Sequence, residues 1–128
     1  MTDQSAERKT RVAAWFRQLR DDIVAEFERL EGDHGGNGPV GQFELRETRR
    51  GDGGTDEGGG LMSVMRGGRV FEKVGVNIST VFGTLGERAQ KAMAARGVPG
   101  MAEDPRFWAS GISVVAHMQN PHTPAVHM

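Results

Sequence analysis

The stretch LMSVMRGGRVFEKVGVNISTVF, residues 61–82, decides the fold. Residues 61–65 and 69–72 flank the dipeptide Gly67-Gly68, and glycine readily adopts the positive φ angles that short hairpin turns require. Residues 74–82 then carry β-branched side chains at Val74, Val76, Ile78, Thr80 and Val81. We therefore predict a hairpin that turns at Gly67-Gly68, followed by a further strand over residues 74–82.

The segment before this hairpin has a helical period. Apolar residues recur every three or four positions, and charged residues fill the positions between them. The apolar set is Val12, Phe16, Leu19, Ile23, Phe27 and Leu30. An amphipathic helix of this kind either packs on a sheet or lies at a membrane surface, and its polar face mixes both signs of charge, which favours packing on a sheet.

The remaining elements are shorter. We predict a strand at residues 42–49, a helix at residues 87–96 that ends before Gly97, and a strand at residues 111–118. Glycine-rich loops are expected at residues 32–41 and 51–60, and Pro121 and Pro124 are expected to exclude regular structure from there to residue 128. The whole chain, 1–128, is predicted to be a single α+β domain, with a mainly antiparallel sheet flanked by helices and preceded by the amphipathic helix.

The glycine run at residues 58–60 has two interpretations. It lacks the GxxxxGK[ST] order of a phosphate loop and the GxGxxG order of a dinucleotide loop. A flexible loop is one interpretation, and a backbone held close to a ligand is the other.

Composition excludes several classes of protein. The formal net charge is −1, from 16 Lys and Arg against 17 Asp and Glu, so no basic field would attract nucleic acid. There is no cysteine, which excludes disulfides, thiolate metal sites and cysteine nucleophiles. No apolar run approaches the roughly 20 residues of a membrane span, so we expect no membrane span and a cytoplasmic location.

Three of the four histidines, His117, His122 and His127, fall within eleven residues. Their spacing of five is not that of a helical zinc site, and spacing alone leaves both a metal site and ordinary loop histidines open. Ser113 and His117 are four residues apart in the last predicted strand, so both side chains point to one face. A serine and a histidine on one face can direct polar groups at a single ligand.

Several motifs occur in an order that resembles the oxygen-dependent coproporphyrinogen oxidases. They are GGG at 58–60, FEKVGVN at 71–77, GISVVAHMQNP at 111–121 and PAVH at 124–127. The family's corresponding stretches read like GGGG, FEKxGVN, GxSLVxHxxNP and PxxHxNxR. The resemblance covers roughly residues 42–128 and identifies the chain as the N-terminal portion of a family member.

This resemblance implies a function in haem biosynthesis. The family uses molecular oxygen to decarboxylate two propionates of coproporphyrinogen III to vinyl groups, giving protoporphyrinogen IX, and it works as a homodimer. The resemblance further implies that Ser113 binds substrate, that His117 and His127 bind a divalent metal, and that His127 is the catalytic proton donor. We expect these 128 residues alone to be inactive, and a non-catalytic module that binds a tetrapyrrole or a metal is the alternative.

Overall fold

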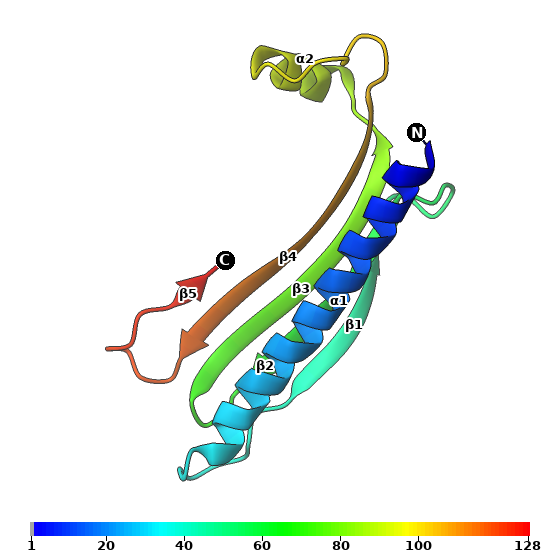
Figure 1. Cartoon of the computed structure of the whole chain (residues 1–128). Coiled ribbons are helices and arrows are strands. Elements are labelled where there is room, and N and C mark those ends of the chain that lie inside the picture. The colour runs from blue at the N-terminus through cyan, green and yellow to red at the C-terminus, as the bar shows by residue number, and fades with distance from the viewer. Residues whose placement is uncertain (1) are drawn as a thin grey trace.

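The computed structural model describes residues 2–128, with side chains from Gln4 onward. Two helices and five strands follow one another along the chain. Their bounds are α1 Thr2–Asp33, β1 Phe43–Arg49, β2 Gly58–Arg66, β3 Phe71–Thr84, α2 Glu87–Ala95, β4 Arg106–Met118 and β5 Val126–His127. The strands form one antiparallel sheet in the order β1-β2-β3-β4-β5. Helix α1 runs along one face of this sheet, and α2 lies at the end remote from β5 (Figure 1). The predicted α+β class is confirmed.

The hydrophobic core lies between α1 and the sheet. Six buried side chains from three strands make it up: Met65, Phe71, Val74, Val76, Val114 and Ala116. The α1 residues Ile23, Val24 and Phe27 pack against them, and the Phe27 ring meets Phe71 edge-on with centroids 4.9 Å apart. The helix therefore packs on the sheet, as predicted, through Ile23 and Phe27 of the apolar stripe, whereas Val12 and Leu30 at its two ends are exposed. Neither helix in the described residues has both the length and the apolar character needed to cross a bilayer.

A buried carboxylate joins the end of α1 to the β2–β3 hairpin. The hairpin turns at Gly67-Gly68 as predicted, with Gly67 at φ 62°. Glu31, fully buried, accepts hydrogen bonds from four backbone N–H groups. The donors are Gly41 at 2.8 Å, Arg69 at 2.5 Å, Val70 at 2.6 Å and Phe71 at 3.1 Å. Burial acts to raise the pKa of Glu31, but these donors outweigh it and hold the pKa below its ordinary value.

The glycine run at residues 58–60 is the start of β2 and not a loop, which corrects the expectation for the last three residues of 51–60. A Cβ at Gly59 would stand 2.0 Å from the Thr48 carbonyl oxygen, and one at Gly60 would stand 2.1 Å from that of Ile78. Glycine is required here because neighbouring strands leave no room for a side chain. The close approach is made by the protein's own backbone.

Three other expectations are wrong. The second hairpin arm, expected at residues 69–72, and the further strand, expected at residues 74–82, form one continuous strand, β3. Strand β4 begins at Arg106, five residues before the predicted start. Regular structure also resumes after Pro124, because Val126 and His127 pair with Ala116 and Val115. The prolines lie in the turn that reverses the chain, where no ladder hydrogen bond from their nitrogen is needed.

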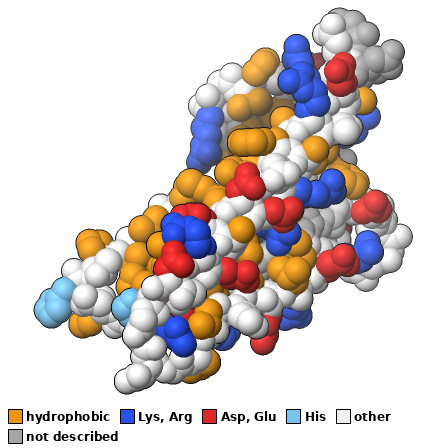
Figure 2. Space-filling model, turned by 60° about the horizontal axis from the view of Figure 1, so that its bottom comes forward, with side chains coloured by type: hydrophobic (Ala, Val, Ile, Leu, Met, Phe, Trp, Pro, Cys, Tyr) orange, Lys and Arg blue, Asp and Glu red, His pale blue; other side chains and the backbone are white. Residues whose placement is uncertain are grey.

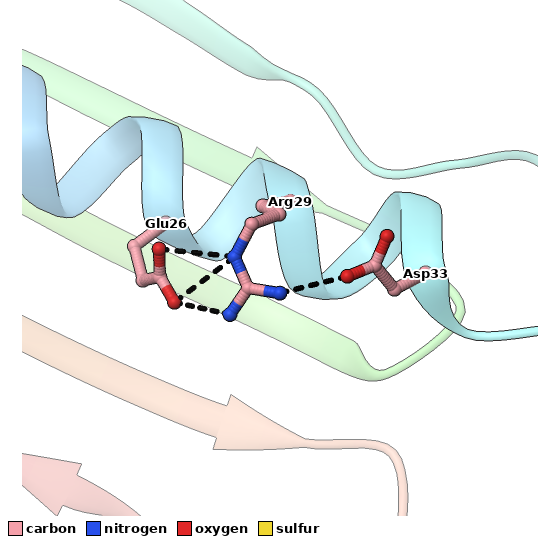
Figure 3. A network of polar contacts seen from close by, with 3 residues as sticks. All are labelled: Glu26, Arg29 and Asp33. Carbon is pink, nitrogen blue, oxygen red and sulfur yellow. Dashed lines mark hydrogen bonds and ion pairs between the residues drawn. The ribbon is translucent and has the colours of Figure 1, made fainter.

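The outer surface of α1 is polar and mixed in sign. Arg29 lies between Glu26 and Asp33, one helical turn away on either side, and donates hydrogen bonds to both carboxylates (Figure 3). The hydrogen bond from Arg29 lowers the pKa of Glu26. Figure 2 shows basic and acidic side chains interspersed with apolar ones over the face in view. This distribution agrees with the near-zero net charge.

Candidate functional site on the open face of the sheet

Three predicted site residues lie on the sheet face opposite α1, which we call the open face. In β4, Val114 and Ala116 are buried toward the helix, so the alternating Ser113, Val115 and His117 point the other way and are exposed. In the part of the chain that the structure describes, no helix covers this face. Ser113 and His117 are four strand residues apart, a separation of about 13 Å.

The two predicted metal-binding histidines are in contact. His127 pairs with Val115 in the β4–β5 ladder, which puts its side chain on the open face beside His117. The two Nε2 atoms are 3.2 Å apart, and the ring centroids are 5.4 Å apart. One ring can therefore donate to the other, or both nitrogens can turn to a common ion.

The turn between β4 and β5 creates this pairing. Asn120 accepts hydrogen bonds at its carbonyl from the Thr123 N–H and at its side chain from the His122 N–H. Past the turn, Val114 and Met128 exchange two backbone hydrogen bonds of 2.9 and 2.8 Å. His122 lies within the turn, outside the His117–His127 pair. Spacing in the sequence could not reveal the pair, because it depends on how β5 folds back.

Strand register adds neighbours that the sequence analysis did not assign to the site. Asn77 stands directly opposite Ser113, Gly75 opposite Val115, and Lys73 opposite His117. The Oδ1 atom of Asn77 is buried and has no hydrogen-bond donor among the described residues. The motif FEKVGVN contains all three positions, but only the pairing register shows that they share the open face.

The distance between the two histidine Nε2 atoms can be compared with the geometry of a metal site. Two imidazole nitrogens bound to one tetrahedral ion at about 2.0–2.1 Å stand about 3.3–3.4 Å apart, close to the 3.2 Å between His117 and His127. Within residues 4–128, no group of three or more His, Asp or Glu side chains is arranged to hold an ion. The spacing of the pair would suit two ligands of one ion, and a complete site would need further ligands that the described residues do not supply.

A cavity of about 500 Å³ lies on the opposite side of the sheet, between α1 and the glycine-rich start of β2. Its walls carry arginines and acids in equal number, and none of the predicted site residues lines it. The charged residues are Arg17, Arg20, Arg49, Asp21, Glu47 and Asp56. We assign the candidate site to the open face, because Ser113, His117 and His127 all lie there.

Comparison with known proteins identifies the family. The sequence model described as coproporphyrinogen III oxidase matches residues 11–128. The chain belongs to the coproporphyrinogen III oxidase family. The expectation drawn from the GGG, FEKVGVN and GISVVAHMQNP motifs is thus confirmed, and the match also takes in most of α1.

Curated relatives agree with this family. An oxygen-dependent coproporphyrinogen-III oxidase of Rickettsia bellii (strain RML369-C) is 49% identical over 118 residues, which are 90% of this chain and 38% of the relative. The protein of the same name from Rickettsia felis (strain ATCC VR-1525 / URRWXCal2) is 42% identical over 124 residues, or 94% of this chain and 40% of the relative. The chain therefore spans about two fifths of the length of the coproporphyrinogen III oxidases it matches.

Proposed function

We propose that this chain forms part of the site of an oxygen-dependent coproporphyrinogen oxidase, an oxidoreductase of haem biosynthesis. The observation that carries the proposal is the 3.2 Å approach of His117 and His127 on the face that also bears Ser113. Family membership supplies the substrate class, and the geometry supports one shared site for the three residues.

The reaction requires groups of these kinds. Each propionate that becomes a vinyl group loses carbon dioxide, one proton and two electrons, and molecular oxygen accepts the electrons. In this proposal Ser113 hydrogen-bonds the substrate, since a hydroxyl orients a carboxylate or a pyrrole N–H without adding charge. His127 moves the proton, because an imidazole exchanges protons near neutral pH.

A divalent metal is part of the proposal. His117 and His127 would hold it through their Nε2 atoms, and when bound it would supply positive charge beside the substrate carboxylate. Asn77 supports a ligand on this face for a separate reason. Its buried Oδ1 has no donor among the described residues, and a porphyrinogen carries pyrrole N–H donors.

Binding under anaerobic conditions tests the proposal. Coproporphyrinogen III, prepared and titrated under argon, should bind the chain saturably, and Ser113→Ala should weaken binding while Ser5→Ala on α1 should not. Absence of saturable binding would refute the proposal for this chain. Admission of air then tests whether the chain alone is catalytic. Vinyl product would contradict the expectation that these 128 residues alone are inactive, and bound substrate without product would agree with it.

A non-catalytic tetrapyrrole- or metal-binding module is the second candidate. The observation that favours it is that the described residues bring only two histidines together, fewer than a closed metal site needs. Homodimer assembly remains a prediction from the resemblance, and a cytoplasmic location remains a prediction from the lack of a long apolar run in the sequence. Sedimentation analysis of the native protein, together with its intact mass from the source cell, tests assembly.

A further inference from the structure

The pairing registers place the residues of the open face in three rows that cross the central strands β2, β3 and β4. These strands lie side by side in Figure 1. The first row combines two polar residues with a methionine, the next is apolar around a glycine, and the third is cationic and ends at the histidine pair. From the registers the rows are Met62–Asn77–Ser113, Val64–Gly75–Val115 and Arg66–Lys73–His117. His127 lies beside Val115, at the end of the middle row.

The two cations of the third row have no acidic partner among the described side chains. Arg66 and Lys73 are exposed and stand opposite each other in the β2–β3 ladder. Neither forms an ion pair in the part of the chain that the structure describes, whereas five other pairs involving Arg or Lys are present there. Glu44 of β1 lies at the end of the middle row, opposite Val64, and forms no ion pair with them.

The middle row leaves open space above the sheet. A Cβ placed at Gly75 would meet only the Asn77 amide nitrogen, at 3.6 Å. Val64 and Val115 flank this position with apolar side chains. The centre of the face is therefore apolar, and no side chain projects from it at Gly75. A macrocycle can lie over Gly75, with one edge toward Asn77 and Ser113 and its opposite edge toward the cations.

We propose that Lys73 and Arg66 are the carboxylate-binding residues of this face, and that they hold a propionate of the substrate next to the His117–His127 pair. This inference rests on the proposed function and adds to it. Adjacent antiparallel strands are about 5 Å apart, so a carboxylate on the Lys73 ammonium lies within reach of His117. The planar guanidinium group of Arg66 can donate a hydrogen bond to the second oxygen of the same carboxylate.

Two porphyrins that differ only in carboxylates test the inference. Coproporphyrin III carries four propionates, and mesoporphyrin IX carries two propionates with ethyl groups in place of the others. Binding of each to the full chain is followed by fluorescence titration at two salt concentrations. The variants are Lys73→Gln, Arg66→Gln and the double variant, with Lys73→Arg as the charge-conserving change. Arg88→Gln, on exposed α2 at the far end of the sheet, is the matched control.

We expect wild-type protein to prefer coproporphyrin III. Each glutamine variant should raise its Kd about two- to fivefold, and the double variant about tenfold, with a weaker dependence on salt. Lys73→Arg and Arg88→Gln should retain the preference, and circular dichroism should match wild type throughout.

Two failures are distinguishable. If wild type binds neither porphyrin saturably, the proposed function fails for this chain. If wild type binds coproporphyrin III but the double variant keeps the same Kd and the same preference over mesoporphyrin IX, the assignment of Lys73 and Arg66 is wrong while the proposed function stands.

Discussion

Replacing Glu31 by glutamine should destabilise the protein by several kcal/mol. The carboxylate uses Oε1 to accept from the Gly41 and Arg69 N–H groups, and Oε2 to accept from those of Val70 and Phe71. In Glu31→Gln one oxygen becomes an NH2 group, which faces two buried N–H donors and cannot accept from them. Leaving two buried donors unsatisfied, at about 1–3 kcal/mol each, gives an expected loss of about 2–6 kcal/mol.

This loss is large against the total stability of a small domain, about 5–15 kcal/mol. Urea denaturation followed by tryptophan fluorescence and by circular dichroism measures it, and agreement between the two signals checks two-state behaviour. Glu28→Gln is the matched control on the same helix. Glu28 is exposed and accepts one hydrogen bond of 3.3 Å from the Phe43 N–H, which an amide oxygen can also accept. The control should change the stability by less than about 0.5 kcal/mol.

The reasoning is refuted if Glu31→Gln unfolds at the same urea concentration as wild type. The Gly68→Ala variant separates the position of the Glu31 carboxylate from its charge. Its added Cβ would stand 2.3 Å from Glu31 Oε1 and displace the carboxylate without altering its charge. Similar losses in both variants would identify the hydrogen-bonded geometry, and not the charge alone, as the source of stability.

Further predictions concern acid stability, the glycine strand, the histidine pair and Asn77. The folded-state pKa of Glu31 is depressed below 4.5. The contribution of the ionised carboxylate to stability is therefore present above pH 4.5 and is lost as pH falls through the folded-state pKa. In urea titrations at a series of pH values, wild type should lose stability on acidification more steeply than Glu31→Gln. Gly59→Ala should cost at least about 1–3 kcal/mol, because its Cβ would meet the Thr48 carbonyl oxygen, while Gly35→Ala, which has open space, should cost little. His117→Ala or His127→Ala should weaken Zn²⁺ binding more than about tenfold by calorimetry, with His122→Ala as a control near wild type; equal affinities in all three would contradict the proposed ligands. Asn77→Leu removes a buried acceptor that has no donor, so it should change stability by less than about 1 kcal/mol but weaken coproporphyrinogen binding; unchanged binding would exclude a role for Asn77 in the site.

The sequence predicted correctly those elements whose formation depends on residues close together in the chain. Gly67-Gly68 marked the hairpin because short turns need positive φ, and the apolar period of α1 marked the face that packs on the core. Helix α2 was predicted within one residue of its bounds. In each case the deciding residues are neighbours in the sequence.

The failures share a non-local cause. The run Gly58–Gly60 looked like a loop, because the crowding that requires glycine comes from Thr48 on β1 and Ile78 on β3. The end of the chain looked irregular, because the pairing of His127 with Val115 depends on a reversal through Pro121 and Pro124. For the site, family motifs supplied Ser113, His117 and His127, but only the β3–β4 register puts Lys73 and Asn77 beside them.

The short path between β4 and β5 also restricts how this protein can evolve. Both histidines lie within eleven residues, so the pair is inherited as one compact segment and needs no coordination between distant parts of the gene. Side chains alternate along β5, so any insertion or deletion that shifts its register by one residue would turn His127 toward the α1 side of the sheet. Length changes in this turn that preserve the pair must therefore either be absorbed as a bulge or occur two residues at a time.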